Sequence, residues 1–121
     1  MSGTSEALTR RVAEIAEDKG GSDVIALDVR ELVGYTDFLV ICSARNERQA
    51  KAIHDDVYER MKAEGHLPAR VEGRSEAQWV LLDYLHCVLH VFTPEARERY
   101  RLDTLWGEAK KLDLDTERGA A

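Results

Sequence analysis

The spacing of apolar residues along the chain predicts an alternation of helices and strands. In the first segment, about residues 5–18, apolar side chains recur at helical spacing: Leu8, Val12, Ile15 and Ala16. Two glycines at positions 20 and 21 end this pattern. Residues 24–29 are rich in β-branched side chains, which favours a short strand. The run 38–42 is continuously apolar, so we expect a central strand with both faces covered.

The strongest helix signal follows position 45. Asn46 is a suitable N-cap, and Gln49 three residues later would complete a capping box. Gly65 supplies the C-terminal stop. Between them runs one apolar stripe, formed by Ala50, Ile53, Val57 and Met61. We therefore expect an amphipathic helix that packs this stripe on the core.

The second half of the chain predicts three strands and a final helix. The strands are expected at 70–72, 78–84 and 87–92, and the last two are close enough to form a hairpin. Thr93 and Pro94 form a helix start, because threonine caps and proline fits the first helical position. One helix is then expected to carry the remaining large apolar side chains, Tyr100, Leu102, Leu105 and Trp106.

This order of elements predicts an α/β (α+β) fold, a mixed sheet of about five strands with helices packed on it. A chain of 121 residues is long enough for one domain with a real core. We expect that domain at residues 1–111, followed by a polar, flexible tail at 112–121.

The predicted hairpin divides its residues between two faces. If Leu85 and His86 form a two-residue loop, Tyr84 lies opposite Cys87. Two-residue loops prefer glycine or asparagine where φ is positive, and this loop has neither. One face is then almost wholly apolar, with Val80, Leu82, Tyr84, Cys87, Leu89 and Val91. The other, which we call the mixed face, displays Trp79, Leu81, Asp83, Val88, His90 and Phe92.

Two interpretations of the mixed face remain open. Aromatic side chains combined with a few polar groups are typical of a protein–protein interface. Alternatively, Trp79 and Phe92 belong to a second core layer that the terminal helix covers.

Composition constrains the partner and the compartment. The net charge of −6 disfavours a general nucleic-acid binder, which needs excess cations to displace counterions from phosphate. Acidity suits a basic protein partner, and it equally serves solubility. Cys42 and Cys87 lie in apolar runs, as free thiols of cytosolic proteins do. The N-terminal segment has no signal-peptide pattern and no apolar run reaches the roughly 18 residues of a membrane span, so we expect a soluble, cytoplasmic protein.

Five blocks of the sequence together resemble a known family. The first reads TDFLVICS at 36–43 with NERQ at 46–49. The later blocks are EG at 72–73, WVLLDY at 79–84, HVF at 90–92 and LWG at 105–107. In order and spacing these are similar to the blocks of the ribosomal silencing factor (RsfS, Iojap-like) family, over about residues 8–108.

The resemblance implies a nucleotidyltransferase-like fold without its catalytic acids, and a binding protein that needs no cofactor. It implies binding to the large ribosomal subunit through large-subunit protein fourteen, a steric block to small-subunit joining, repression of translation and a role in large-subunit maturation. It also implies a homodimer. Trp79, Leu81, Asp83 and Tyr84 fall in the block that the family presents to its partner. We add His90 from the mixed face and Glu72 as further partner contacts.

One position departs from the family pattern. Family members usually have Gly-Asp after the Asp-Tyr of this block, whereas this chain has Leu85 and His86. The geometry of the hairpin turn is therefore open.

The alternative function is a metal-dependent nucleotidyltransferase or nuclease acting on RNA. A nucleotidyltransferase needs two acids spaced Asp-x-Asp or Asp-x-Glu on a strand to hold Mg²⁺. After position 43 the first paired acids, Asp55 and Asp56, are adjacent on a helix. A nuclease would recruit scattered acids together with one cation: Asp37, Glu72, Asp83 and Arg74. We therefore expect no catalysis.

Two other clusters carry weaker signals. On a strand His86 and His90 share a face while Cys87 points away, so no zinc site is expected. His54 and His66 are expected at the surface. A small basic cluster lies around the start of the second helix, and it is either a solvated face or a minor contact with ribosomal RNA phosphate: Arg45, Arg48 and Lys51.

Overall fold

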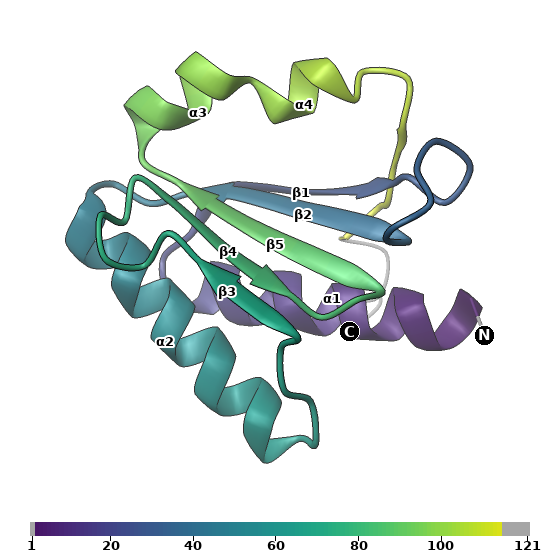
Figure 1. Ribbon diagram of the computed structural model, residues 1–121, viewed down its shortest axis with the longest axis horizontal. Helices are drawn as coiled ribbons and strands as arrows, with labels where there is room; N and C mark the ends of the chain where they lie inside the picture. The colour runs from purple at the N-terminus through teal and green to yellow at the C-terminus, as the bar shows by residue number, and fades with distance from the viewer. Residues whose placement is uncertain (1, 115–121) are drawn as a thin grey trace.

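The computed structural model describes residues 2–114, in which helices pack on both faces of a six-stranded mixed sheet (Figure 1). The helices are α1 (Ser2–Asp18), α2 (Glu47–Ala63), α3 (Pro94–Tyr100) and α4 (Leu102–Leu105). The strands are β1 (Ser22–Asp28), β2 (Phe38–Ser43), β3 (Arg70–Glu72), β4 (Trp79–Asp83), β5 (Cys87–Phe92) and β6 (Lys110–Lys111). The predicted α+β class with a mixed sheet is confirmed. The short β6 is the strand that the apolar pattern did not predict.

The strands are ordered β3-β4-β5-β2-β1-β6 across the sheet. Only the pairing of β2 with β5 is parallel, and it runs from Phe38 opposite Cys87 to Ser43 opposite Phe92. Every residue of β2 is buried, as predicted for a central strand with both faces covered.

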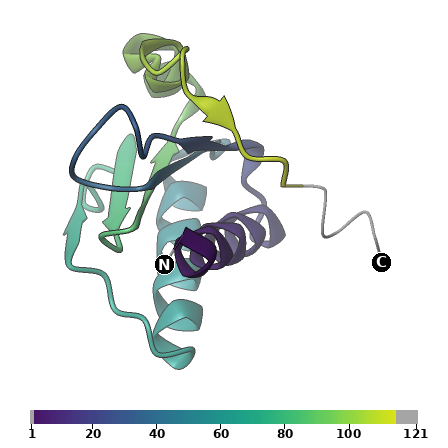
Figure 2. The same cartoon turned by 90° about the vertical axis from the view of Figure 1, so that its right-hand side faces the viewer.

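One face of the sheet is covered by the two long helices α1 and α2 (Figures 1 and 2). The predicted stripe of α2 is completely buried in this layer: Ala50, Ile53, Val57 and Met61. It packs against the apolar face of the hairpin, whose six predicted residues all belong to the same core cluster. Burial of this stripe is what holds α2 on the sheet.

The start of α2 is capped as predicted, with one difference. The side chain of Asn46 accepts a hydrogen bond of 2.9 Å from the backbone N–H of Gln49. The Gln49 side chain accepts from the N–H of Arg45 at 2.9 Å, whereas a capping box requires the N–H of Asn46. The hydrogen bond from the Gln49 side chain back to the incoming chain is therefore made one residue earlier than predicted.

The other face is covered by α3 and α4. Thr93 caps α3, and its side chain accepts from the N–H of Ala96 at 3.4 Å. The prediction of one continuous terminal helix is wrong, because Arg101 adopts a left-handed conformation with φ of 47° and separates α3 from α4. A non-glycine residue in this region cannot continue a right-handed helix.

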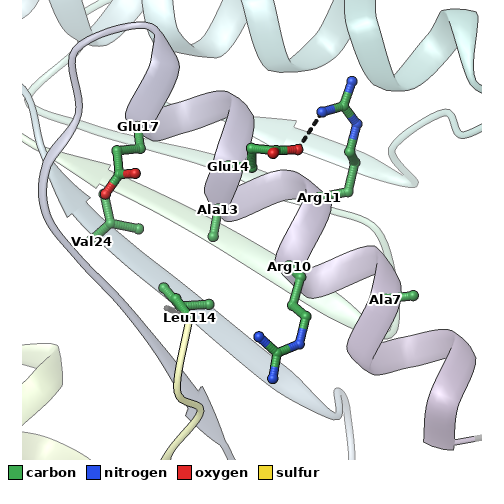
Figure 3. Close-up of a pocket in the computed structure, with 8 residues that line it drawn as sticks. All are labelled: Ala7, Arg10, Arg11, Ala13, Glu14, Glu17, Val24 and Leu114. Carbon is green, nitrogen blue, oxygen red and sulfur yellow. Dashed lines mark hydrogen bonds and ion pairs between the residues drawn. The ribbon is translucent and has the colours of Figure 1, made fainter. Parts of the chain in front are cut away.

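The chain then returns along the sheet edge. β6 pairs with β1, and the N–H of Leu112 donates to the carbonyl of Ala26 at 2.8 Å. Leu114 lies in a groove of about 180 Å³ beside α1, where Arg10 lies close by (Figure 3). Leu112 and Leu114 are half-buried against the core, and the remainder of the expected tail, 115–121, lies outside the described residues.

His54 is not at the surface as predicted but 6% exposed. It lies four residues after Ala50 and three before Val57, so it falls on the buried face of α2. Its Nδ1 lies 2.8 Å from the Asp55 carboxylate, which Arg74 also binds at 2.8 and 2.9 Å. His66 is exposed, as predicted. Within residues 2–114, every helix is too short or too polar to cross a lipid bilayer.

A candidate partner-binding groove on the sheet

The hairpin of β4 and β5 has the predicted register. Trp79 pairs with Phe92 and Asp83 with Val88, and the N–H of Tyr84 donates to the carbonyl of Cys87 at 2.9 Å. Leu85 therefore begins a two-residue loop, and it takes a positive φ of 72°. The Asp83 carboxylate accepts a hydrogen bond of 2.8 Å from the Leu85 N–H, which holds the turn.

The mixed face is divided into a covered part and an open part, and the interpretation as a second core layer holds for the covered part. Phe92 and Val88 are buried in a second core cluster beneath α3 and α4. Trp79 and Leu81 border this cluster and are half-buried. The short helices lie over the β1, β2 and β5 side, and the β4 side extends beyond them (Figure 1).

Trp79 links the covered and the open part of this face. Its ring centroid lies 5.0 Å from Phe92, 5.9 Å from His90 and 4.7 Å from Tyr100 of α3. Its indole Nε1–H donates a hydrogen bond of 3.0 Å to Nδ1 of His90. Indole is a donor only, so His90 Nδ1 is the acceptor.

This hydrogen bond fixes the state of His90. Burial lowers the pKa of His90 to about 4, while the nearby Asp83 charge opposes the shift. The ring is therefore neutral at pH 7, and because Nδ1 accepts, the single proton sits on Nε2. Because Trp79 occupies Nδ1, the Nε2–H of His90 is the group that can donate a hydrogen bond.

An open groove of about 630 Å³ begins where the covered part ends. It is lined by Tyr35, Ala69, Arg70, Leu81, Asp83, Leu85, Val88 and His90. Three of the predicted partner residues therefore lie together: Leu81, Asp83 and His90. Its rim carries two strongly exposed apolar side chains, Tyr35 at 62% and Leu85 at 59%. Neither was predicted, although an aromatic residue beside Gly34 and a leucine in a tight turn were signals that could have identified them.

Charged side chains border the same groove. Arg70 on the edge strand β3 contacts Glu72 at 3.0 Å and Asp83 at 3.7 Å. Glu72 is exposed and sits opposite Leu81 in the β3–β4 pairing. Tyr84 is separate from this set, since it is 6% exposed on the α1–α2 face and burial raises its pKa. It supports the hairpin from below and does not line the groove.

Of the residues considered for catalysis, Glu72 and Asp83 lie near each other, since both contact Arg70, but Asp37 and Arg74 have partners elsewhere. Asp37 accepts a 2.6 Å hydrogen bond from Ser5 and lies 3.3 Å from His86, whereas Arg74 is paired with Asp55 of α2. Among residues 2–114, no three His, Cys, Asp or Glu side chains are grouped as metal ligands would be. Burial raises the pKa of both Cys42 and Cys87 to about 12, so neither thiol is a nucleophile at neutral pH.

The basic cluster lies at the opposite end of the sheet from the groove. Arg45 and Arg48 are exposed and Lys51 is half-buried, all near the start of α2.

Several known proteins are similar to this chain. A ribosomal silencing factor from Bacillus subtilis is 33% identical over 110 residues, which cover 91% of this chain and 93% of the relative. The chloroplastic Iojap protein of Zea mays is 30% identical over 109 residues, covering 88% of this chain and 47% of the relative. A crystal structure from Chromobacterium violaceum superposes with a TM-score of 0.82 at 30% identity, covering 84% of this chain and 85% of that one.

The family model described as ribosomal silencing factor during starvation (RsfS) matches residues 2–121. This match spans both helical layers, the sheet and the groove. Together with relatives that are at least 30% identical over most of the chain, it establishes that the protein belongs to the RsfS family of ribosomal silencing factors.

Proposed function

We propose that this chain binds the large ribosomal subunit with the groove on the mixed face, takes large-subunit protein fourteen as its partner, and blocks joining of the small subunit sterically. Family membership supports the ribosomal target. The observation that carries the site is the open groove, in which apolar side chains surround a few fixed polar groups. Such a composition is typical of the centre of a protein interface.

The hairpin tip supports a binding role for this surface. Leu85 combines 59% exposure with a φ of 72°. A left-handed conformation costs a non-glycine residue about 1–2 kcal/mol, and an exposed leucine gains little from folding. Glycine or asparagine would remove that cost. Leu85 is thus unfavourable for folding, and a contact between its side chain and a partner would explain why leucine occupies this position.

The polar groups define what the partner offers. The Nε2–H of His90 suits a carbonyl or carboxylate oxygen, since the ring is a neutral donor. Asp83 and Glu72 suit lysine or arginine side chains of a basic ribosomal protein, and they contribute to orientation and association rate. Arg70 lies between these carboxylates in the free protein, so a basic partner would compete with it.

Sedimentation with isolated large subunits tests the site. Leu81→Glu places a charge in the groove on a half-buried position, and we expect at least a thirtyfold loss of affinity, which corresponds to about 2 kcal/mol. Leu32→Glu is the matched control, because Leu32 is 45% exposed and lines a separate depression with Asp28 and Lys110. The control should bind like the unmodified chain and inhibit subunit joining equally. Binding by a folded Leu81→Glu variant at full affinity would exclude the groove.

The proposed function is non-catalytic. Incubation with nucleotides or RNA and Mg²⁺ or Mn²⁺ should give no product above a blank. The alternative, a metal-dependent enzyme acting on RNA, predicts turnover that Asp83→Ala abolishes.

We also propose a homodimer in the absence of ribosomes. The exposed apolar rim of the groove supports self-association, because a small monomer rarely leaves such a patch uncovered. Light scattering at micromolar concentration should report about twice the chain mass of 13.7 kDa. A chain that stays monomeric up to about millimolar concentration would contradict this proposal.

A further inference from the structure

Of the eleven arginines within residues 2–114, eight have a side-chain hydrogen bond or ion pair. Arg11 contacts Glu64 at 2.7 Å, Arg30 contacts Asp28 at 2.6 Å and Arg74 contacts Asp55 at 2.8 Å. Five others contact a carboxylate, hydroxyl or carbonyl oxygen: Arg10, Arg60, Arg70, Arg97 and Arg101. Across residues 2–114, the side chains of Arg45, Arg48 and Arg99 have no such partner.

These three unpaired arginines lie at one end of the molecule. Arg45 and Arg99 line the same cleft of about 330 Å³, between the starts of α2 and α3. This is the end of the sheet at which the parallel strands β2 and β5 finish, and both helices begin there (Figure 1). Arg48 and Lys51 follow on α2 at three-residue spacing, which places them on one face of the helix.

The chemistry of the cleft favours phosphate. A guanidinium presents a planar fork of N–H donors that matches two phosphate oxygens. Within residues 2–114, no carboxylate contacts the guanidinium of Arg45 or Arg99, so both can bind an added anion. Gln78 also lines the cleft, and its side-chain amide donates a hydrogen bond of 3.5 Å to Glu47. Glu47 and Glu95 also line the cleft, so its charges are mixed. Selectivity for phosphate would come from the positions of the arginines and not from net charge.

We infer that Arg45, Arg48 and Arg99, assisted by Lys51, form a second contact surface that binds the phosphate backbone of ribosomal RNA. The inference rests on the proposed function, because it requires the chain to sit on the large subunit. The groove is lined by Val88 and His90 of β5, and the cleft by Thr93, which lies three residues or about 10 Å beyond His90 along the chain. One end of the sheet thus contacts protein and the other contacts RNA, which fixes the orientation of the domain on the subunit.

The test compares two triple variants of the full chain with equal changes in charge. R45Q/R48Q/R99Q removes the unpaired arginines. K62Q/K110Q/K111Q removes three exposed lysines near the C-terminal end of α2 and on β6, away from the cleft. Binding to isolated large subunits is measured by sedimentation from about 50 to 200 mM salt, and thermal melting confirms that both variants fold.

We expect the arginine variant to bind at least tenfold more weakly at the lowest salt and to lose about 2 to 3 from the slope of log K against log salt, since each phosphate contact contributes roughly 0.7–0.9. The lysine variant should keep the slope of the unmodified chain. Equal slopes for both variants would overturn the inference. Total loss of binding by Leu81→Glu with intact binding by both triple variants would leave the proposed function standing and remove this contact alone.

A second measurement separates RNA from an acidic protein surface. The unmodified chain should shift the anisotropy of a labelled RNA duplex of about 20 base pairs at low salt, and the arginine variant should not. If the arginine variant changes the salt slope on large subunits while the unmodified chain leaves the RNA anisotropy unchanged, the partner is protein and the inference is wrong.

Discussion

The two faces of the sheet are made by alternate residues of the same strands, yet they are covered to different extents. The 17-residue helices α1 and α2 each span about 25 Å and bury the residues that β4, β5 and β2 direct towards them, whereas Val71 of the edge strand β3 stays 39% exposed. On the mixed face, α3 has seven residues and α4 has four, and the left-handed Arg101 separates them. The second pair cannot reach across the sheet.

The incomplete cover has a functional meaning. Leu82 and Leu81 are neighbours in β4, but Leu82 is 1% exposed in the first core cluster while Leu81 borders the open groove. The first face holds the fold together, and the uncovered part of the second is the surface that we propose for partner binding. Substitutions on the two faces should therefore differ in their effects on stability and binding.

The largest effect is expected from neighbouring leucines on opposite faces. Leu82→Ala leaves a cavity in a fully covered core and should lower the free energy of unfolding by about 2–5 kcal/mol. Leu81→Ala should lower it by about 1 kcal/mol, because part of this side chain is already in contact with solvent. Urea denaturation of both variants measures the difference, and equal losses would show that the two faces are equally packed.

The second effect is a pH dependence that originates on the mixed face. The pKa of His90 is about 4 in the folded protein and about 6.5 when exposed, so the unfolded chain binds a proton first as the pH falls. The contribution of neutral His90 to the free energy of unfolding is therefore fully present above pH 6.5. It is lost as the pH falls from about 6.5 to 4, and the loss is on the order of 3 kcal/mol. Denaturation at pH 7 and 4.5 measures this loss, and His90→Gln should remove most of it. The Asp55 carboxylate, whose pKa Arg74 lowers to about 2, loses its contribution only below about pH 4.

A smaller effect isolates the hydrogen bond between Trp79 and His90. Trp79→Phe keeps a ring against Phe92 and Tyr100 but removes the Nε1–H donor, so the free energy of unfolding should fall by about 1 kcal/mol. Without that donor the neutral form of His90 is less favoured, and its pKa should rise above 4. Titration of the His90 ring protons by NMR measures the shift. An unchanged pKa would mean that burial alone sets the state of this histidine.

The smallest effect is a gain in stability at the hairpin tip. Leu85→Asn places a residue that tolerates positive φ at 72°, and it should raise the free energy of unfolding by about 0.5–1 kcal/mol. The same change removes an exposed apolar side chain from the groove rim, so binding to large subunits should weaken. Leu32→Asn, outside the groove, is the control. It should neither raise the free energy of unfolding nor weaken binding to large subunits. A more stable Leu85→Asn variant that binds normally would separate the turn from the partner surface.

The sequence alone determined most of the elements and the two faces of the hairpin. Period-two alternation assigned each residue of the hairpin to its face, and the two-residue loop followed from the spacing even though Leu85 and His86 are unusual turn residues. The caps at Asn46 and Thr93 and the buried stripe of α2 were likewise readable, because these are local interactions within a few residues.

Only the tertiary structure decided how these elements combine into a site. The break at Arg101 and the short pairing of β6 with β1 carry no periodic signal. His54 does have the helical spacing of the buried stripe, and its polar side chain led to the wrong prediction of a surface position. The groove requires Tyr35, Arg70 and His90 to meet from three separate segments, and the unpaired state of Arg45 and Arg99 depends on which carboxylates the fold brings near other arginines. Such contacts join residues far apart in the chain, so their geometry is set by the packing of the whole domain and not by local pattern.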